Sequence, residues 1–104
     1  EMKSLLSRFS GVKFIFDDVK QKYYPVLRDA ITSFRSKNEG KPLVVIDDTP
    51  FIDFDILDYP VNDIEEIFLL KGSDAAIWGP KASNGIIVII TQRGKSTKIE
   101  QKEE

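Results

Sequence analysis

The strongest structural signal in the chain is the stretch Asn84-Gly85-Ile86-Ile87-Val88-Ile89-Ile90-Thr91. Asn-Gly favours a tight turn, and the residues after it are β-branched aliphatics and a threonine, which are among the types most enriched in strands. We therefore predict a strand over residues 86–91. A second strand is predicted over residues 43–47, because its opening apolar run, Leu-Val-Val-Ile, lacks polar alternation. Such a run is typical of a central strand that is covered on both faces.

The segment before Lys71-Gly72 is ambiguous. Asn62 or Asp63, followed by Glu65 or Glu66, resembles a capping box at the start of a helix. The apolar run over residues 67–70 instead ends like a buried strand. The pattern alone leaves both structures open.

Further elements are predicted on either side of these strands. A short N-terminal helix is predicted from apolar residues at i, i+3, i+4 and i+7, namely Met2, Leu5, Leu6 and Phe9, and Ser10-Gly11 can end it. Residues 12–16 and 31–35 have strand patterns. Between them, Asp17 and Asp18 can cap a helix whose inward-facing residues are Val19, Tyr23, Val26, Leu27 and Ala30. Pro25 should divide this helix into two short pieces and be the first residue of the second piece.

The central part of the chain predicts an irregular acidic loop over residues 47–60, followed by the ambiguous segment. Ser73 is then a good N-cap for a helix of one or two turns through Trp78. Gly79 is placed for the left-handed position after this helix, and Pro80 prevents its continuation. Together these patterns predict an α+β fold, with a small mixed β-sheet and two or three short helices.

Composition restricts the possible functions. The chain has 104 residues, which suits one domain, and it contains no His and no Cys. Ordinary zinc sites and protease-like triads are therefore not expected. A formal net charge of −2 argues against nucleic-acid binding. No apolar stretch approaches the roughly 20 residues of a membrane-spanning helix. We expect one domain over residues 1–94 and a charged tail or linker over residues 95–104.

The order of motifs from Pro42 to Lys95 resembles the plug domain of TonB-dependent outer-membrane receptors, most closely the starch-utilisation type of Bacteroidetes. The matching pieces are Pro42-Leu43-Val44-Val45-Ile46-Asp47, Asp63-Ile64-Glu65-Glu66-Ile67-Phe68-Leu69-Leu70-Lys71-Gly72, Ala75-Ala76-Ile77-Trp78-Gly79 and Ala82-Ser83-Asn84-Gly85 with the strand through Lys95. Asp48 and Ser36 stand where the family usually has glycine, and Trp78 replaces its tyrosine. The resemblance implies a turn or short helix near residues 63–65 and a strand over residues 66–70.

The same resemblance implies a non-catalytic plug that occludes a transporter barrel in the outer membrane and gates the uptake of a glycan, peptide or chelate. It implies as partners a barrel of the same chain, TonB through a segment outside this chain, and a lipoprotein, with no cofactor and no nucleic acid. The alternative is a plug-like interaction module at the end of a multidomain periplasmic or surface protein without a barrel. The charged tail over residues 95–104 favours this alternative.

For several residues a binding role is weighed against a purely structural one. The acidic loop could ligate Ca²⁺ but is expected to be a solvated loop, and its Phe51, Phe54 and Tyr59 are expected to pack beneath it. Trp78 with Gly79 is expected to be structural rather than substrate-facing. Lys71 and Arg93 could pair with a barrel wall or lie in solvent.

An enzyme would need a carboxylate pair, such as Asp47 with Glu65 or Asp63, around a pocket. Gly72-Ser73-Asp74 is too short a signal for a phosphate loop. No residue is assigned a catalytic, cofactor or metal role, and the substrate-contacting residues are left unassigned.

Overall fold

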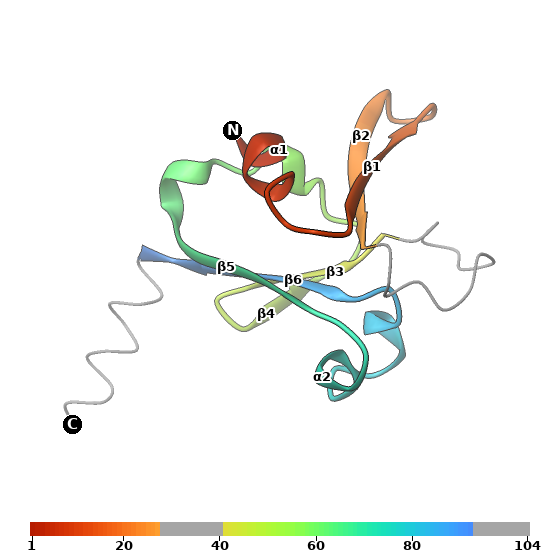
Figure 1. Ribbon diagram of the computed structural model, residues 1–104, viewed down its shortest axis with the longest axis vertical. Coiled ribbons are helices and arrows are strands. Elements are labelled where there is room, and N and C mark those ends of the chain that lie inside the picture. Colours follow the sequence, from red (N-terminus) through yellow and green to blue (C-terminus); the bar gives the residue numbers. More distant parts are fainter. Residues whose placement is uncertain (28–40, 93–104) are drawn as a thin grey trace.

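The computed structural model describes residues 1–27 and 41–92 (Figure 1). The elements, in chain order, are α1 (Met2–Leu6), β1 (Val12–Asp17), β2 (Lys22–Leu27), β3 (Leu43–Ile46), β4 (Thr49–Phe51), the 3-10 turns η2 (Ile56–Asp58) and η3 (Val61–Asp63), β5 (Ile64–Leu70), α2 (Ser73–Ala76), the 3-10 turn η4 (Pro80–Ala82) and β6 (Ile86–Thr91). Short helices and small sheets make this an α+β fold, as predicted.

The main sheet has four strands in the order β4-β3-β6-β5. β3 runs parallel to β6, with Leu43 opposite Ile86 and Ile46 opposite Ile89, while the outer strands pair antiparallel. The predicted strand over residues 86–91 is confirmed and is one of the two central strands. The other is β3, which ends at Ile46 because Asp47 already begins a turn. Of the described helices, none is long and apolar enough to cross a membrane.

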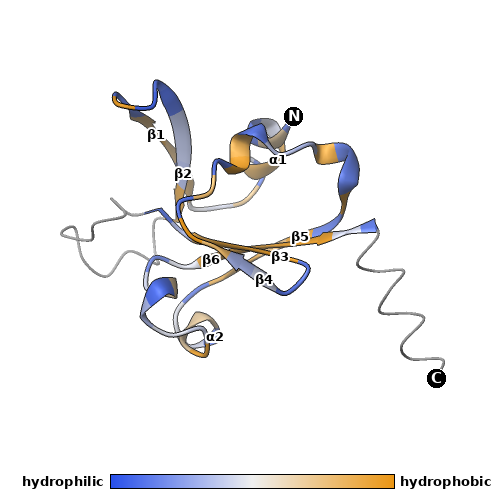
Figure 2. Ribbon diagram, turned by 180° about the vertical axis from the view of Figure 1, so that it is seen from behind, coloured by the Kyte–Doolittle hydropathy of each residue, from blue (hydrophilic) through white to orange (hydrophobic). Residues whose placement is uncertain are grey.

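Each face of the sheet has its own apolar core. α1 and the β1–β2 hairpin lie on one side of the sheet and α2 on the other (Figure 1). The buried cluster on the α1 side consists of Met2, Leu6, Leu27, Val44, Ile56, Ile87 and Ile89. The cluster on the α2 side consists of Leu43, Val45, Ala75, Ala82 and Ile86. Neighbouring residues of β3 and β6 therefore point into different cores, which explains why β3 is apolar throughout and β6 is apolar up to Thr91 (Figure 2).

The acidic segment after β3 is more ordered than the predicted loop. Asp47 and Asp48 have φ angles of 49° and 71°, and they join Ile46 to its partner Thr49. Two positive φ angles in a two-residue connection are the geometry of a type I′ hairpin turn. Asp48, which stands where the family usually has glycine, thus adopts a positive φ, and the sequence prediction missed the short strand β4 that this turn creates.

The two helical pieces predicted within residues 17–30 are wrong over the described part, because residues 22–27 form β2. Asp17 does cap backbone N–H groups, but those of a turn: its Oδ1 accepts hydrogen bonds from the N–H groups of Val19 at 2.9 Å and Lys20 at 3.2 Å. Pro25 lies in β2 opposite Phe14. A two-stranded hairpin tolerates proline because each strand has an outer edge without a hydrogen-bonding neighbour.

Other predictions are corrected in detail. β1 and β2 form a sheet of their own, so residues 12–17 do not join the main sheet. The ambiguous segment is a 3-10 turn, η3, followed by strand β5, as the family resemblance implied. Ser73 is the first helical residue of α2, and Gly72 occupies the N-cap position assigned to Ser73. Gly79 has a φ of 83°, a value that favours glycine. It is not the left-handed residue after α2, because α2 ends at Ala76 with Ile77 as its C-cap, and Gly79 is the N-cap of η4, with a ψ of −168°. The strand predicted over residues 31–35 and the tail over residues 95–104 lie outside the described residues.

Candidate functional site: a charged clasp between the hairpin and the acidic loop

A chain of alternating charges connects the projecting hairpin to the acidic loop. Its order is Asp17–Lys41–Asp53–Lys20–Asp55–Lys22–Asp58, and each neighbouring pair is joined by an ion pair. The shortest contacts are Lys22 Nζ to Asp58 Oδ2, at 2.6 Å, and Lys41 Nζ to Asp53 Oδ1, at 2.7 Å. We call these seven residues the charged clasp. It joins three segments that are far apart in sequence: the hairpin, Lys41 and residues 53–58.

Lys41 is the most enclosed cation of the charged clasp, with 14% of its side chain exposed. Its ammonium lies between Asp53 and Asp17, 3.6 Å from the Asp17 carboxylate, and 4.9 Å from the centre of the Tyr24 ring. The backbone is also held, because the Asn84 side-chain amide donates a hydrogen bond of 3.4 Å to the Lys41 carbonyl. Lys41 therefore couples the hairpin to the start of β3 and to the turn before β6.

The electrostatic environment favours the charged form of every clasp group for which a shift is resolved. The pKa of Asp17 is lowered, first by the hydrogen bond from the Lys20 backbone and then by those from Val19 and Lys41. Lys41, followed by Lys20, lowers the pKa of Asp53. The hydrogen bond and charge of Asp58 raise the pKa of Lys22. Burial acts to lower the pKa of Lys41, but Asp53 and then Asp17 outweigh it, so that pKa is raised.

A hollow of about 220 Å³ lies between the hairpin, the N-terminus and residues 55–58. Tyr23 forms one wall, and Lys3 places its ammonium 4.3 Å from the centre of that ring. The remaining lining combines carboxylates, a lysine and one leucine: Glu1, Lys22, Asp55, Leu57 and Asp58. Both signs of charge beside an aromatic ring give this surface the capacity to contact a polar ligand or a polar protein wall.

The acidic loop is solvent-exposed, as predicted, but its carboxylates also form ion pairs. Asp53, Asp55 and Asp58 contact lysines while 49%, 47% and 62% of their side chains stay exposed. Within residues 1–27 and 41–92, no three acidic side chains are grouped so that they could hold a metal ion. The loop is also anchored from beneath, because Ile56 is 2% exposed and belongs to the core on the α1 side.

The aromatic residues of the loop form a connected row. Phe51 contacts Phe54 with ring centres 5.3 Å apart, and Phe54 contacts Tyr59 at 6.1 Å. Phe54 and Tyr59 pack against the core, which confirms the predicted role for these two, whereas Phe51 is 37% exposed. Trp78 packs against the core on the α2 side, as expected for a structural residue.

Of the carboxylate pairs considered for catalysis, the structure brings Asp47 and Asp63 to the same hollow. Asp47 and Asp63 line one hollow of about 170 Å³ together with Tyr59 and Thr91, while Glu65 does not line it. Both oxygens of Asp47 accept hydrogen bonds from Thr91, one from its N–H at 2.9 Å and one from its hydroxyl at 2.5 Å. Asp47 thus connects the β3–β4 turn to the end of β6 by hydrogen bonds.

Of the two cations predicted to pair with a barrel wall or to lie in solvent, Lys71 is partly buried, and Arg93 lies outside the described residues.

A comparison with protein families identifies the fold. Residues 1–86 match the model of the TonB-dependent receptor plug domain. The chain belongs to the TonB-dependent receptor plug-domain family. No curated protein and no solved structure matches it significantly.

The plug-domain match covers every described element up to the first residue of β6, including α1, the hairpin and the acidic loop. The specific part of the sequence resemblance lies in residues 42–95, and the family match also covers the N-terminal part, where the resemblance is looser. Sequence analysis missed the charged clasp of this plug domain. Its closest pair in sequence, Lys41 and Asp53, is separated by 12 residues, and Lys22 and Asp58 are separated by 36.

Proposed function

We propose that this plug domain occludes the barrel of an outer-membrane TonB-dependent transporter of the starch-utilisation type and gates nutrient uptake without catalysing a reaction. The observation that carries the proposal is the family match over residues 1–86, on a fold whose hairpin and acidic loop share one charged surface. Such a surface suits the polar interior of a barrel. In this proposal TonB and a lipoprotein are further partners, and the imported substrate is a glycan, peptide or chelate.

The charged clasp supports the gating part of the proposal. Its ion pairs join partly exposed side chains, and such pairs are individually weak, typically about 0.2–1 kcal/mol. They can hold the hairpin against the loop at rest and exchange partners with a polar wall when the domain shifts. A fully apolar contact would lose more free energy on separation, because its surface would have to be exposed to water.

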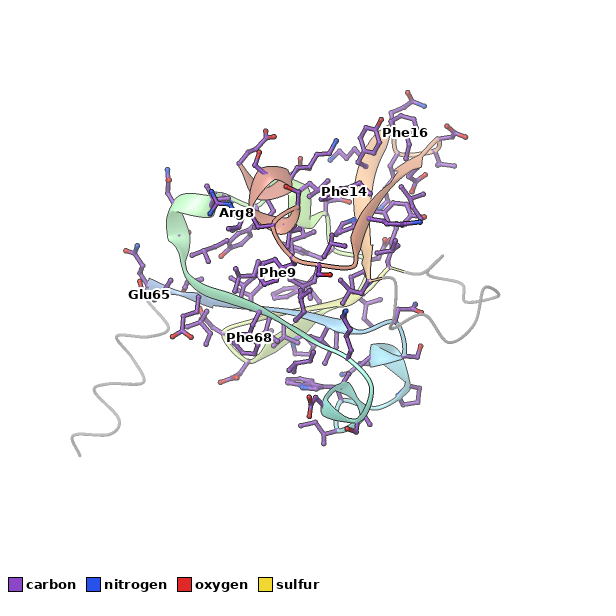
Figure 3. The ribbon with its side chains drawn as sticks, viewed as in Figure 1. Arg8, Phe9, Phe14, Phe16, Glu65 and Phe68 are labelled. Atoms are coloured by element: carbon purple, nitrogen blue, oxygen red, sulfur yellow. The ribbon has the colours of Figure 1, made fainter. Side chains whose placement is uncertain are left out.

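A second candidate function is a protein-interaction module in a periplasmic or surface protein without a barrel. The specific observation in its favour is the apolar end of the hairpin. Val19 is 92% exposed, and the side chains of Phe16 and Tyr23 near it are 42% and 49% exposed. Figure 3 shows Phe16 near the projecting end of the hairpin, away from the sheet. An exposed apolar patch at a projecting end is a common feature of interaction sites.

The two candidates differ in the accessibility of the hairpin end in the native protein. The chain has no cysteine, so Val19→Cys introduces a single thiol into this domain. In outer membranes from cells carrying this variant, in a parent protein free of other reactive cysteines, a bulky maleimide polymer should label the thiol only after the barrel is unfolded by heating. The isolated chain with the same substitution is the control and should be labelled at once. Immediate labelling in the membranes would contradict the plug proposal.

A further inference from the structure

The turn that leads into β6 contains the most reactive asparagine sequence of the chain. Of the three asparagines, Asn38, Asn62 and Asn84, only Asn84 is followed by glycine. The backbone nitrogen of the residue after an asparagine can attack the side-chain amide carbon, and glycine permits this attack best because it has no side chain to obstruct it. Water then opens the cyclic imide that forms, and the asparagine becomes aspartate or isoaspartate.

In the folded domain both reacting groups are held in hydrogen bonds. The Gly85 N–H, which contains the attacking nitrogen, donates to the Ala82 carbonyl at 3.0 Å and closes the turn over residues 82–85. The Asn84 side-chain amide, which would leave, donates to the Lys41 carbonyl at 3.4 Å. Asn84 is also 3% exposed, so water has little access to it. The fold therefore protects this sequence from its own chemistry.

We propose that Asn84 is a site of spontaneous deamidation, which the folded domain suppresses and which reacts when β3 and β6 separate. The turn is tied to the main sheet, because the Leu43 N–H donates to the Gly85 carbonyl at 3.0 Å and Leu43 pairs with Ile86. Opening of the turn therefore requires the first residues of the two central strands to part. The inference does not depend on the plug function, and a barrel around the domain would leave this internal site unchanged.

The reaction needs no partner other than water. The Gly85 nitrogen loses its proton and bonds to the side-chain carbon of Asn84, which releases its amide nitrogen as ammonia. Water then cleaves either carbon–nitrogen bond of the imide, so that the backbone runs either along its original path or through the former side chain. In sum, an amide and a water become a carboxylate and an ammonium ion, and nothing is oxidised or reduced.

Both products conflict with the folded structure. An aspartate at residue 84 has no amide to donate, so a carboxylate would be buried against the Lys41 carbonyl, and both groups are acceptors. An isoaspartate adds a carbon atom to the backbone next to the hydrogen bond between Leu43 and Gly85, which shifts the start of β6 relative to β3. The reaction is thus an irreversible record of the opening of the sheet.

The first test compares the rate of deamidation in the folded and the unfolded chain, in a mildly alkaline buffer without and with guanidinium chloride. Proteolysis and mass spectrometry locate each amide that has become a carboxyl group. In the unfolded chain Asn84 should react faster than Asn38 and Asn62, the internal references. Folding should slow Asn84 at least about tenfold, because only the open fraction reacts. Equal Asn84 rates in both states, or an unfolded chain in which the references react faster, would overturn the proposal.

The route of opening is tested by guanidinium concentrations below the unfolding midpoint. Deamidation is far slower than the opening and closing of strands, so its rate follows the population of the open form. If β3 and β6 must separate, the logarithm of the Asn84 rate should rise linearly with denaturant concentration, as the unfolding constant does. A rate that stays constant over this series would show that the turn opens alone, contrary to the proposal.

The conflict between product and fold is tested by substitution. Asn84→Asp reproduces one product and should unfold at a lower denaturant concentration than wild type. The matched control is Asn62→Asp, because Asn62 is exposed in η3 and its replacement should leave the unfolding midpoint unchanged. An Asn84→Asp chain that unfolds together with this control would refute the inferred conflict.

Discussion

Asp47 compensates for the strain of its own backbone. Its φ of 49° is uncommon for a residue other than glycine. The carboxylate offsets this cost by accepting two hydrogen bonds from Thr91, which is 8% exposed. Asp48, the next residue, has a φ of 71°. Both aspartates of this turn therefore have positive φ angles, and Asp47 is the one that accepts the two hydrogen bonds from Thr91.

This difference predicts unequal tolerance to glycine at two adjacent residues. Asp47→Gly should destabilise the domain by about 1–3 kcal/mol, because the Thr91 donors lose a charged acceptor in a partly buried site. Asp48→Gly should cost less than Asp47→Gly, because glycine adopts positive φ without steric cost and the hydrogen bonds to Thr91 stay in place. Urea unfolding of both variants provides the comparison. Equal losses of stability at both positions would show that the hydrogen bonds between Asp47 and Thr91 contribute nothing to the stability of the domain.

Lys41 is the residue on which the charged clasp depends most, since it contacts Asp53, Asp17 and the Tyr24 ring. Lys41→Met keeps the aliphatic stem and should cost about 1 kcal/mol, a modest loss because solvent screens the half-exposed Asp53. Lys13→Met removes an exposed lysine from the same hairpin and should change stability by less than about 0.5 kcal/mol. Chemical unfolding compares the two variants, and equal losses of stability would show that the contacts of Lys41 contribute no more than an exposed lysine does.

At the scale of elements, the charged clasp controls how the hairpin is held. A carboxyl group with a lowered folded-state pKa stabilises the fold fully above its unfolded value and loses that contribution as pH falls through the lowered pKa. For Asp17 and Asp53, whose ordinary value is 3.8, the loss occurs below that pH. Lys22 and Lys41 have raised pKa values, so their contribution is complete below 10.5 and is lost as pH rises through the raised pKa.

The clasp should therefore make the same contribution to stability across the neutral range and lose it at both extremes. Asp53→Asn should reduce the decline on the acid side, because this variant has no carboxylate to protonate at the centre of the clasp. Unfolding by urea in a series of acidic buffers measures the decline. If wild type and Asp53→Asn lose stability in parallel as the pH falls, Asp53 makes no such contribution.

The elements also show which parts of the fold can be predicted from sequence. β6 was predicted with its observed bounds because strand propensity and the Asn-Gly turn act locally and agree. The hairpin was missed because an aspartate that can cap a helix can equally cap a turn, and because Pro25 interrupts a helix but is tolerated on a strand edge. The charged clasp could not be predicted, since its pairs form only after the hairpin and the loop have been brought together by the fold.

In the molecule as a whole, the main sheet should be least tolerant of substitution, because β3 and β6 contribute side chains to both apolar cores. Ile86 and Ile87 are both fully buried, one in each core. Replacing either with alanine should cost about 2–5 kcal/mol through lost burial and a cavity. Ile77→Ala is the control, since Ile77 is 86% exposed and its loss should cost less than about 0.5 kcal/mol. A tolerant Ile86→Ala would mean that α2 does not cover the sheet.

The most direct test of the central claim concerns the native protein that carries this plug domain. An antibody raised against the domain is used on fractionated cells, and the outer-membrane fraction is run on a denaturing gel with and without boiling. We expect a band in the outer membrane only, far larger than the 11.8 kDa of this chain, that shifts on heating as a closed barrel unfolds. A band outside that membrane, or one without the heat shift, would contradict it.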